Sequence, residues 1–347
     1  VLETARGGIL RAGLGFDRAD VAVVTNIGEG DHLGISDIHT LEDLARVKRV
    51  IAENVGPNGS AVLNAADPLV ANMAPFCPGS VIFFAQDPEN AVIQAHRALG
   101  GRAVVIRHGE IVLVEGTRET GLARLFDIPL THGGRIGFQV ENTLASAAAA
   151  WALGIDTETI RNGLESFGSE MHTVPGRFNL LEIGGATVVL DYGHNPSALL
   201  AMIEAIDPLP HERRMAVYSA AGDRRDEDMI RQGQILAGAF DSVYLYEDQY
   251  TRGRADGEIM ALFRQGLNAG GRVRSVQEFR GSIKAVEAAL KAVRSGDLLL
   301  LQADVVDETL DFVKAYLASG VPGREIDLNE AMDVPAHDVI FAGPLLD

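Results

Sequence analysis

Residues 187–196, TVVLDYGHNP, decide the fold. The apolar strand TVVLD ends on Asp191 and a glycine turn, and Pro196 can begin a helix directly after it. The same pattern recurs along the second half of the chain. The further strands are MAVYSAA (215–221), SVYLYE (242–247), RVRSV (272–276) and DLLLLQAD (297–304), and the helices start near Ser197, Asp226, Asp256, Ser282 and Asp307. This alternation predicts βαβ units, a mostly parallel sheet and an α/β fold.

Polar side chains follow these strands where each strand ends. They are Asp191, His194, Asp223, Arg224, Glu247 and Asp248. The carboxyl ends of parallel strands share one edge of the sheet, which is the usual ligand site of an open α/β domain. Asp191 suits a ribose hydroxyl, and the N-terminus of the next helix suits an anion. As alternatives, His194 can satisfy a backbone carbonyl, and the run GDRRDED (222–228) can be a charged helix start.

The first half of the chain predicts a second polar site. The strand VAVVT (21–25) leads into TNIGEGDHLG (25–34), and another apolar run ends at NAADP (64–68). Between them, LEDLARVKRVIAENV (41–55) has apolar residues at helical spacing and stops at Gly56 and Pro57. We expect this helix to bring Lys48 back toward the turn that holds Asp31 and His32.

Lys48 and His32 could then hold a divalent metal. A buried lysine loses its proton readily, and the neutral amine can react with carbon dioxide to give a carbamate, which is an anionic ligand. The alternative is that His32 caps a turn and that Lys48 is a solvated helix residue. The spacing alone favours this alternative.

Three more residues are candidates for metal or nucleotide binding. Glu3 could reach a metal, although a single carboxylate near the start of a sequence is usually exposed. Asn142 lies near the start of the alanine-rich helix ENTLASAAAAWALG (141–154). It could pair with a purine edge, and helix capping is the simpler expectation. Arg177, in VPGRF (174–178) at the expected joint between two domains, could bind phosphate or form an interface salt bridge.

The remaining segments are less regular. Between residues 60 and 138, the short runs SVIFFA, AVVIRH and EIVLVEG predict a strand-rich insert or sheet edge. Residues 321–347 lose the periodicity and are predicted to form a loosely held tail.

Composition excludes some classes of function. The chain has 347 residues, which fits two or three domains. Its 30 basic and 48 acidic residues give a net charge of −18, which disfavours nucleic acid and anionic membranes as partners. Cys77 is the only cysteine, so no intrachain disulfide can form, and a reducing cytoplasm is expected. No apolar run approaches the roughly 18 residues that a membrane span needs.

Several common motifs are missing from the sequence. It contains no GxxxxGK[ST] phosphate loop and no GxGxxG after a strand, and it lacks CxxC, HExxH and GxSxG. A nucleotide-dependent function would therefore need a phosphate loop upstream of Val1. Because the sequence also starts without methionine, we expect it to be the back part of a longer protein.

Taken in order, seven features resemble the Mur ligase superfamily over about residues 1–320. They are ETARGGILR, TNIGEGDHLG, Lys48, ENTLASAAAA, PGRF, DYGHNP and AAGDRRDED. The run YEDQYTRGRADGEI (246–259) resembles the arginine-adding, polymer-forming branch of that superfamily rather than its cell-wall ligases. The resemblance implies a truncated central ATPase-type domain without its phosphate loop at 1–174, a Rossmann-like C-terminal parallel-sheet domain at 175–320, and a tail at 321–347.

The resemblance also implies a reaction. Such an amide ligase uses ATP and Mg²⁺ to phosphorylate a carboxylate, and an amine then attacks the acyl phosphate. A hinge that closes over both substrates would keep water away from this labile intermediate. In the arginine-adding branch, the α-amine of arginine is joined to side-chain carboxylates of a poly-aspartate backbone, which gives cyanophycin. A separate region of the full-length enzymes adds aspartate, and those enzymes are expected to be homo-oligomers.

Roles for individual residues follow from the same resemblance. Glu3 and His32 would coordinate magnesium, and Lys48 matches the lysine that is carbamylated in Mur ligases and would help to place a second metal. Asn142 would meet the adenine and Arg177 the phosphates. Asp191 would bind the ribose, with His194 near the same pocket. Lys48, His32 and Arg177 would thus be the catalytic residues.

The shared strand-end edge suggests how arginine could be held. Arg224, beside Asp223, would bind the carboxylate of the incoming arginine, and Glu247 or Asp248 would take its guanidinium bidentately. Without a phosphate loop, residues 1–347 alone are expected to be inactive.

Two other interpretations remain. One is another ligase of the superfamily, acting on a folate or peptidoglycan precursor. The other is a degenerate Mur-like domain kept as a scaffold or polymer-binding module. The presence of His32, Lys48, Arg177, Asp191 and His194 favours an active enzyme, because a scaffold needs no metal or nucleotide ligands.

Overall fold

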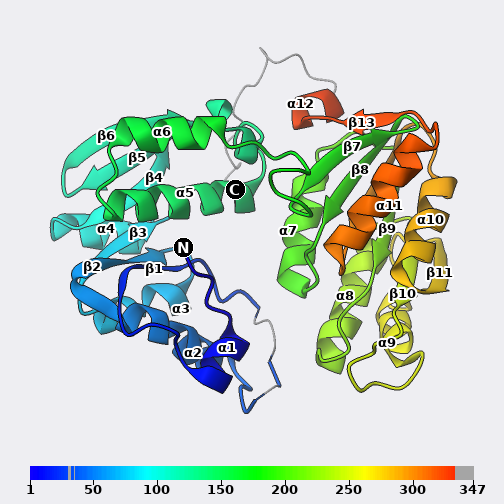
Figure 1. Cartoon of the computed structure of the whole chain (residues 1–347), viewed down its shortest axis with the longest axis horizontal. Coiled ribbons are helices and arrows are strands. Elements are labelled where there is room, and N and C mark those ends of the chain that lie inside the picture. Colours follow the sequence, from blue (N-terminus) through cyan, green and yellow to red (C-terminus); the bar gives the residue numbers. More distant parts are fainter. Residues whose placement is uncertain (30–32, 35, 333–347) are drawn as a thin grey trace. The chain divides into compact units, whose positions relative to one another are not determined.

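The computed structural model describes residues 1–29, 33–34 and 36–332, in two compact units, Val1–Phe167 and Gly168–Asp347. Each unit has its own sheet (Figure 1), and the first unit has a hydrophobic cluster on each face of its sheet, whereas the second unit has a core of its own. No helix in the described ranges is both long enough and apolar enough to cross a membrane.

The sheet of the first unit has six strands that follow one another in chain order. They are β1 (Ala19–Val24), β2 (Val55–Asn64), β3 (Ser80–Phe84), β4 (Arg102–Arg107), β5 (Glu110–Glu115) and β6 (Arg118–Arg124). The pairs from β1 to β4 are parallel, and β4, β5 and β6 form an antiparallel meander. The strands expected between 60 and 138 therefore extend the sheet and form one of its edges.

Helices cover both faces of this sheet. The helices of this unit are α1 (Arg6–Ala12), which contacts α2, and α2 (Leu41–Glu53), α3 (Pro68–Ala71), α4 (Ala91–Ala98), α5 (Gly137–Ala152) and α6 (Thr157–Ser166), with short 3₁₀ turns at Ala74–Phe76, Leu125–Asp127 and Pro129–Thr131. Residues of α2, α3 and α4 share one core with the sheet, and residues of α5 and α6 share the other. The small buried side chains of α5, such as Ala147 and Ala148, let this helix lie close to β2, β3 and β4.

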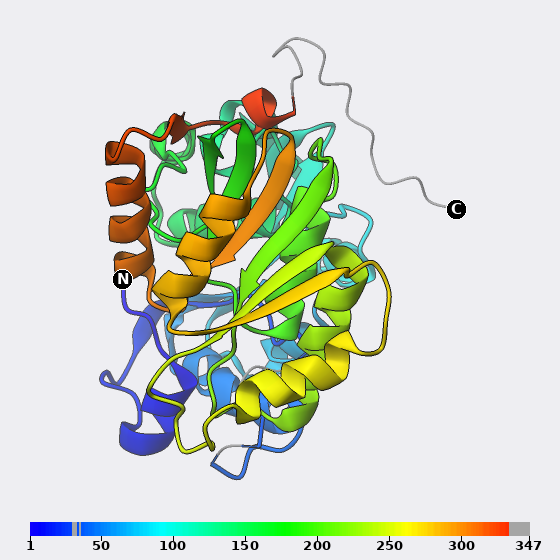
Figure 2. The ribbon, with the colours of Figure 1, turned by 90° about the vertical axis from the view of Figure 1, so that its right-hand side faces the viewer.

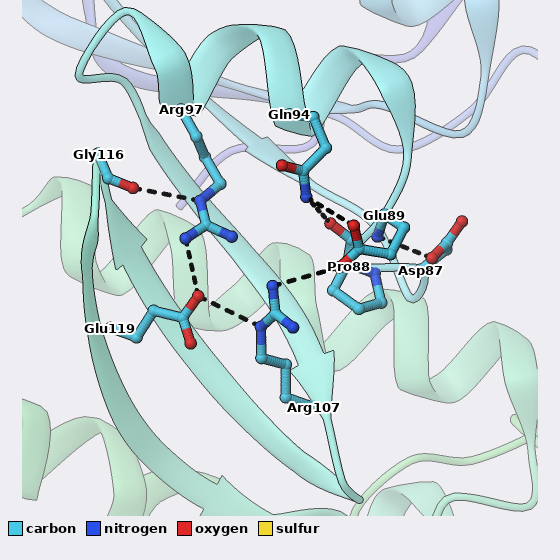
Figure 3. A network of polar contacts seen from close by, with 8 residues as sticks. All are labelled: Asp87, Pro88, Glu89, Gln94, Arg97, Arg107, Gly116 and Glu119. Carbon is cyan, nitrogen blue, oxygen red and sulfur yellow. Dashed lines mark hydrogen bonds and ion pairs between the residues drawn. The ribbon is translucent and has the colours of Figure 1, made fainter.

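An ion-pair network fastens α4 to the antiparallel edge (Figure 3). Arg97 binds Glu119 at 2.7 Å and the Gly116 carbonyl at 3.2 Å, and Arg107 approaches the same Glu119 oxygen at 3.3 Å. Glu89 lies 3.5 Å from Arg107. Because both guanidinium groups already have carboxylate partners of this chain, we assign the network a structural role.

The second unit has a seven-stranded sheet in the order β11-β10-β9-β12-β8-β7-β13. The strands are β7 (Asn179–Ile183), β8 (Ala186–Asp191), β9 (Arg213–Tyr218), β10 (Ser242–Glu247), β11 (Ser275–Arg280), β12 (Asp297–Gln302) and β13 (Gly323–Glu325). The predicted parallel arrangement holds from β11 to β8. β7 and β13 add an antiparallel edge, so residues 323–325 of the predicted tail are a strand of the sheet.

Helices also cover both faces of the second sheet. They are α7 (Pro196–Ile206), α8 (Asp226–Ala239), α9 (Glu258–Leu267), α10 (Ser282–Ala292), α11 (Val306–Ala318) and the short α12 (Leu328–Ala331). Figure 2 shows α10 in front of the strands and α11, in dark orange, at the left beside them, and the two helices share a core with one face of the sheet. α8 packs between α7 and α9, and the contact between Tyr218 and Phe263 places α9 against the opposite face.

The strand order creates a switch point at β12. This strand comes last among the parallel strands in the chain, but it lies between β8 and β9, and all six of its residues are buried. Continuous burial is typical of a parallel strand covered on both faces. The chain after β12 enters α11 on one face, whereas the chain after β9 enters α8, which packs with α9 on the other. Ligands of open α/β sheets bind in the crevice that such a reversal leaves at the carboxyl ends.

Candidate functional site

The predicted site residues divide between the two units. Glu3, Lys48 and Asn142 belong to the first unit, and Arg177, Asp191, His194, Asp223, Arg224, Glu247 and Asp248 belong to the second. His32 and Asp31 lie outside the residues that the structure describes.

Lys48 lies where the sequence predicts, at the end of β1. A capping box of Thr40 and Asp43 starts α2, and the helix carries Lys48 back along the strand. The Lys48 ammonium donates to the carbonyl of Asn26 at 3.2 Å, and the side chain is half-buried. It is therefore not the fully solvated helix residue of the alternative interpretation.

Asp67 fixes the loop that follows β1. One of its carboxylate oxygens accepts the N–H groups of Ile27 at 2.6 Å and Gly28 at 3.4 Å. The other oxygen caps α3 by accepting the N–H of Leu69 at 2.9 Å. Asp67 belongs to the NAADP cluster, so the sequence pointed to the segment but not to this anchoring role.

The metal set is only partly described. Glu3 is exposed just before α1. Within the described part of the chain, no group of three or more His, Cys, Asp or Glu side chains is arranged to hold a metal ion. Magnesium binding by Glu3, His32 and Lys48 thus stays a prediction.

Asn142 does not cap a helix. α5 begins at Gly137, after Ile136 in the capping position, so Asn142 lies well inside the helix and the capping expectation is wrong. Its side chain is exposed and donates to the Gln139 side-chain oxygen at 3.1 Å. An exposed amide on a rigid helix is compatible with a ligand contact.

Asp191 organises the polar end of β8. Its two oxygens accept the N–H groups of Gly193 at 2.7 Å and Phe178 at 2.9 Å, and the residue is only 8% exposed. Burial raises the pKa of the Asp191 carboxyl, although the two N–H bonds and the charge of Arg177 oppose this rise. The bond to Phe178, whose φ of 55° is unusual for a residue other than glycine, holds the Arg177 segment against the loop after β8.

Arg177 and His194 both contact Tyr192. The exposed Arg177 guanidinium lies 5.2 Å from the centre of the Tyr192 ring, and the His194 ring contacts the same tyrosine edge-on at 4.7 Å. A nitrogen of Arg224 lies 2.9 Å from His194 Nε2. Because a guanidinium can only donate, His194 Nε2 is the acceptor, and the ring proton is on Nδ1. The structure thus brings Arg177, Asp191, His194 and Arg224 together.

Asp223 and Arg224 are held by arginines of the next loop. Asp223 accepts from Arg224 at 3.1 Å and from Arg252 at 3.0 Å. Arg254 donates to the carbonyls of Gly222 at 2.7 Å and Arg224 at 2.6 Å. The run that contains Arg252 and Arg254 marks the family in the sequence, but local pattern does not indicate these two contacts.

Glu247 and Asp248 have partners that the local sequence does not predict. Glu247 is 1% exposed, and its Oε1 accepts from the Arg280 guanidinium and from the Gly257 N–H at 2.8 Å. Asp248 accepts the N–H of Ser282 at 2.9 Å, at the start of α10. Glu247 is therefore not placed to receive a substrate guanidinium, because it is buried and already paired with one.

A buried polar network supports the whole edge. Gln302, at the end of β12, accepts from the Ser219 N–H and the Tyr246 hydroxyl, both at 3.2 Å, and donates to the Tyr192 carbonyl at 3.4 Å. The Ser219 hydroxyl donates to the Tyr246 carbonyl at 2.7 Å. Burial holds the pKa of the Tyr246 hydroxyl well above its ordinary value, so it remains a donor. The ends of β8, β9, β10 and β12 are thereby connected.

Comparison with known proteins agrees with this architecture. Residues 1–150 match the family "Mur ligase middle domain", and residues 176–304 match "Mur ligase, glutamate ligase domain". The chain is 41% identical to the cyanophycin synthetase of Synechocystis sp. over 91% of its length, and 39% identical to that of Crocosphaera subtropica over 90%. It spans 36% of the length of each of these two relatives.

Solved structures show the same fold at low identity. Escherichia coli FolC, in complex with DHPP and ADP, aligns with a TM-score of 0.61 at 19% identity, over 86% of this chain and 62% of that one. A pseudomurein peptide ligase type C from Methanothermus fervidus aligns with a TM-score of 0.58 at 18% identity, over 86% and 64%. The chain therefore belongs to the Mur ligase superfamily, carries its middle and C-terminal domains, and is similar to cyanophycin synthetases.

Proposed function

We propose that this chain is the ligase portion of a cyanophycin synthetase and that it adds arginine to aspartate side chains of a poly-aspartate backbone at the expense of ATP. The observation that carries the proposal is the 41% identity to a cyanophycin synthetase over 91% of the chain. Identity to a diaminopimelate-adding cell-wall ligase, from Gloeobacter violaceus, is 30% over 68% of the chain.

The arrangement of the second unit suits recognition of phosphate and ribose. Arg177 presents an exposed guanidinium, and the segment that carries it is tied to Asp191 through the Phe178 N–H. Asn195 caps α7, whose N-terminus follows the same loop. We assign phosphate contacts to Arg177 and, with His194 nearby, the ribose contact to Asp191. Each Asp191 oxygen takes one N–H of the chain and has a second lone pair for a hydroxyl.

The first unit would supply the metal and adenine contacts. Lys48 lies beside Asn26 at the end of β1, where an amine or its carbamate could face a metal with Glu3 and His32. Asn142 would meet the adenine through its exposed amide. Magnesium would supply positive charge that stabilises phosphoryl transfer from ATP to the aspartate carboxylate.

The test is amino-acid incorporation by the complete natural polypeptide that contains residues 1–347. Labelled arginine, lysine, glutamate and diaminopimelate are offered with Mg²⁺-ATP and a poly-aspartate primer. We expect arginine to be incorporated far more than the others. Preference for diaminopimelate or glutamate would favour another ligase of the superfamily. Polymer binding without ATP turnover would favour the scaffold.

A further inference from the structure

The carboxylates at the ends of β8, β9 and β10 are already bound by groups of this chain. Asp191 accepts hydrogen bonds from two backbone N–H groups, and Asp223 forms ion pairs with two arginines. Glu247 is paired with Arg280, and Asp248 accepts an N–H at the N-terminus of a helix. A cationic substrate would have to displace one of these partners to bind there.

Asp304 differs from all of them. It follows β12, at the switch point of the sheet, and it is half-buried. Among the residues that the structure describes, no side chain or N–H forms a hydrogen bond or ion pair with its carboxylate. Asp304 belongs to the same polar edge as the other candidates, because its N–H lies 3.4 Å from the Tyr246 hydroxyl at the end of β10, and its charge contributes to the raised pKa values of Arg252 and Tyr246.

The backbone around Asp304 is fixed. Its N–H points to the Tyr246 hydroxyl at 3.4 Å, and Gln302, two residues earlier, is held by the Ser219 N–H and by Tyr246. The carboxylate is therefore presented from a rigid base on the strand between β8 and β9. Preorganisation of this kind lowers the entropy cost of binding.

A half-buried carboxylate that forms no hydrogen bond or ion pair with any of the described residues attracts a cation. A metal ion fits poorly, since the described residues contain no set of three or more suitable ligands. A substrate ammonium also fits poorly if it is the nucleophile, because a neighbouring carboxylate would keep it protonated. A guanidinium stays charged and can bind a carboxylate through two parallel hydrogen bonds.

We propose that Asp304 accepts the guanidinium of the amino-acid substrate and sets the preference for arginine. This inference rests on the arginine-adding function proposed above. It replaces Glu247, which the structure shows to be paired with Arg280, in the role of guanidinium acceptor.

The test compares arginine with citrulline, which has the same length and a neutral end group. In the complete natural polypeptide, Asp304→Asn should lower kcat/KM for arginine by roughly 10- to 100-fold, mainly through KM, and should change the value for citrulline little. Asp304→Glu should recover part of the preference. Asp307→Asn removes the same charge from an exposed position on α11 and should leave both substrates unaffected.

Each outcome has a defined meaning. Equal losses for arginine and citrulline, or an unchanged preference in Asp304→Asn, would overturn the role of Asp304 while the arginine-adding function stands. If the unmodified protein does not prefer arginine at all, both the arginine-adding function and the role of Asp304 are wrong. Thermal melts check that the variants fold, and Asp304→Ser serves as a smaller replacement if the asparagine variant does not.

Discussion

Arg254 is predicted to hold the loop that presents Asp223 and Arg224. Its guanidinium donates to two backbone carbonyls of that loop, and its side chain is only 15% exposed. Arg254→Ala leaves both carbonyls without this donor. Hydrogen bonds from charged groups contribute about 1.5–3 kcal/mol each. Since the loop can relax and recruit water, we expect a local loss of about 2 kcal/mol rather than the full sum.

Hydrogen exchange measures this loss directly. The N–H of Arg224 is bonded to the Ala221 carbonyl at 3.1 Å and reports on the loop. A local loss of about 2 kcal/mol corresponds to roughly 30-fold faster exchange. Arg264→Ala removes an ion pair to Glu278 that is more exposed, at 54% for the arginine, and should leave this exchange unchanged. Unaltered exchange in Arg254→Ala would refute the assignment of Arg254 as the anchor.

Three further predictions concern helix packing, pH and the proposed role of Lys48. Gly266→Ala places a Cβ 2.1 Å from a backbone carbonyl of α8, so urea unfolding should show a loss of about 1–3 kcal/mol in the free energy of unfolding. Gly238→Ala is the control, because its Cβ would meet nothing within 4 Å and should not destabilise the protein. Burial acts to raise the pKa of Asp241, but Arg272 and a backbone N–H hold that pKa below its ordinary value. The free energy of unfolding of the wild type should therefore exceed that of Asp241→Asn by the largest amount at neutral pH, and this difference should shrink as the pH falls below about 4. A difference that grows in acid would contradict this sign. Lys48→Arg keeps the positive charge but cannot form a carbamate, so the rate of ADP release by the complete polypeptide should fall by at least about 100-fold. A near-normal rate of ADP release would exclude carbamate chemistry at this position.

Much of the fold could be predicted because burial leaves a periodic signal. The run DLLLLQ is apolar throughout since β12 is covered on both faces, and its regular alternation with helices indicated the parallel sheet. β7 was not predicted, because it is short and joins β8 through a tight turn at Gly184 and Gly185. β13 has three exposed residues, so it gives no apolar signal and depends on pairing with β7.

The site could be predicted only as a set of strand ends. Sequence places Glu247 at the right edge, but its partner Arg280 comes from the end of the neighbouring strand, and local pattern does not show that pairing. Asn142 looked like a cap because α5 starts at Gly137 without a capping side chain. Asp304 was not among the predicted site residues, since the absence of a hydrogen-bond or ion-pair partner among the described residues is a tertiary property that local sequence does not show.

The most direct test of the central claim is the coupling of arginine addition to ATP use. ADP release by the complete natural polypeptide is measured with poly-aspartate primer present, with and without arginine, alongside arginine incorporation. We predict one ADP per arginine added, no release without primer, and negligible turnover by residues 1–347 alone. ADP release that does not depend on arginine, or vigorous arginine addition by the isolated 347-residue chain, would contradict the account.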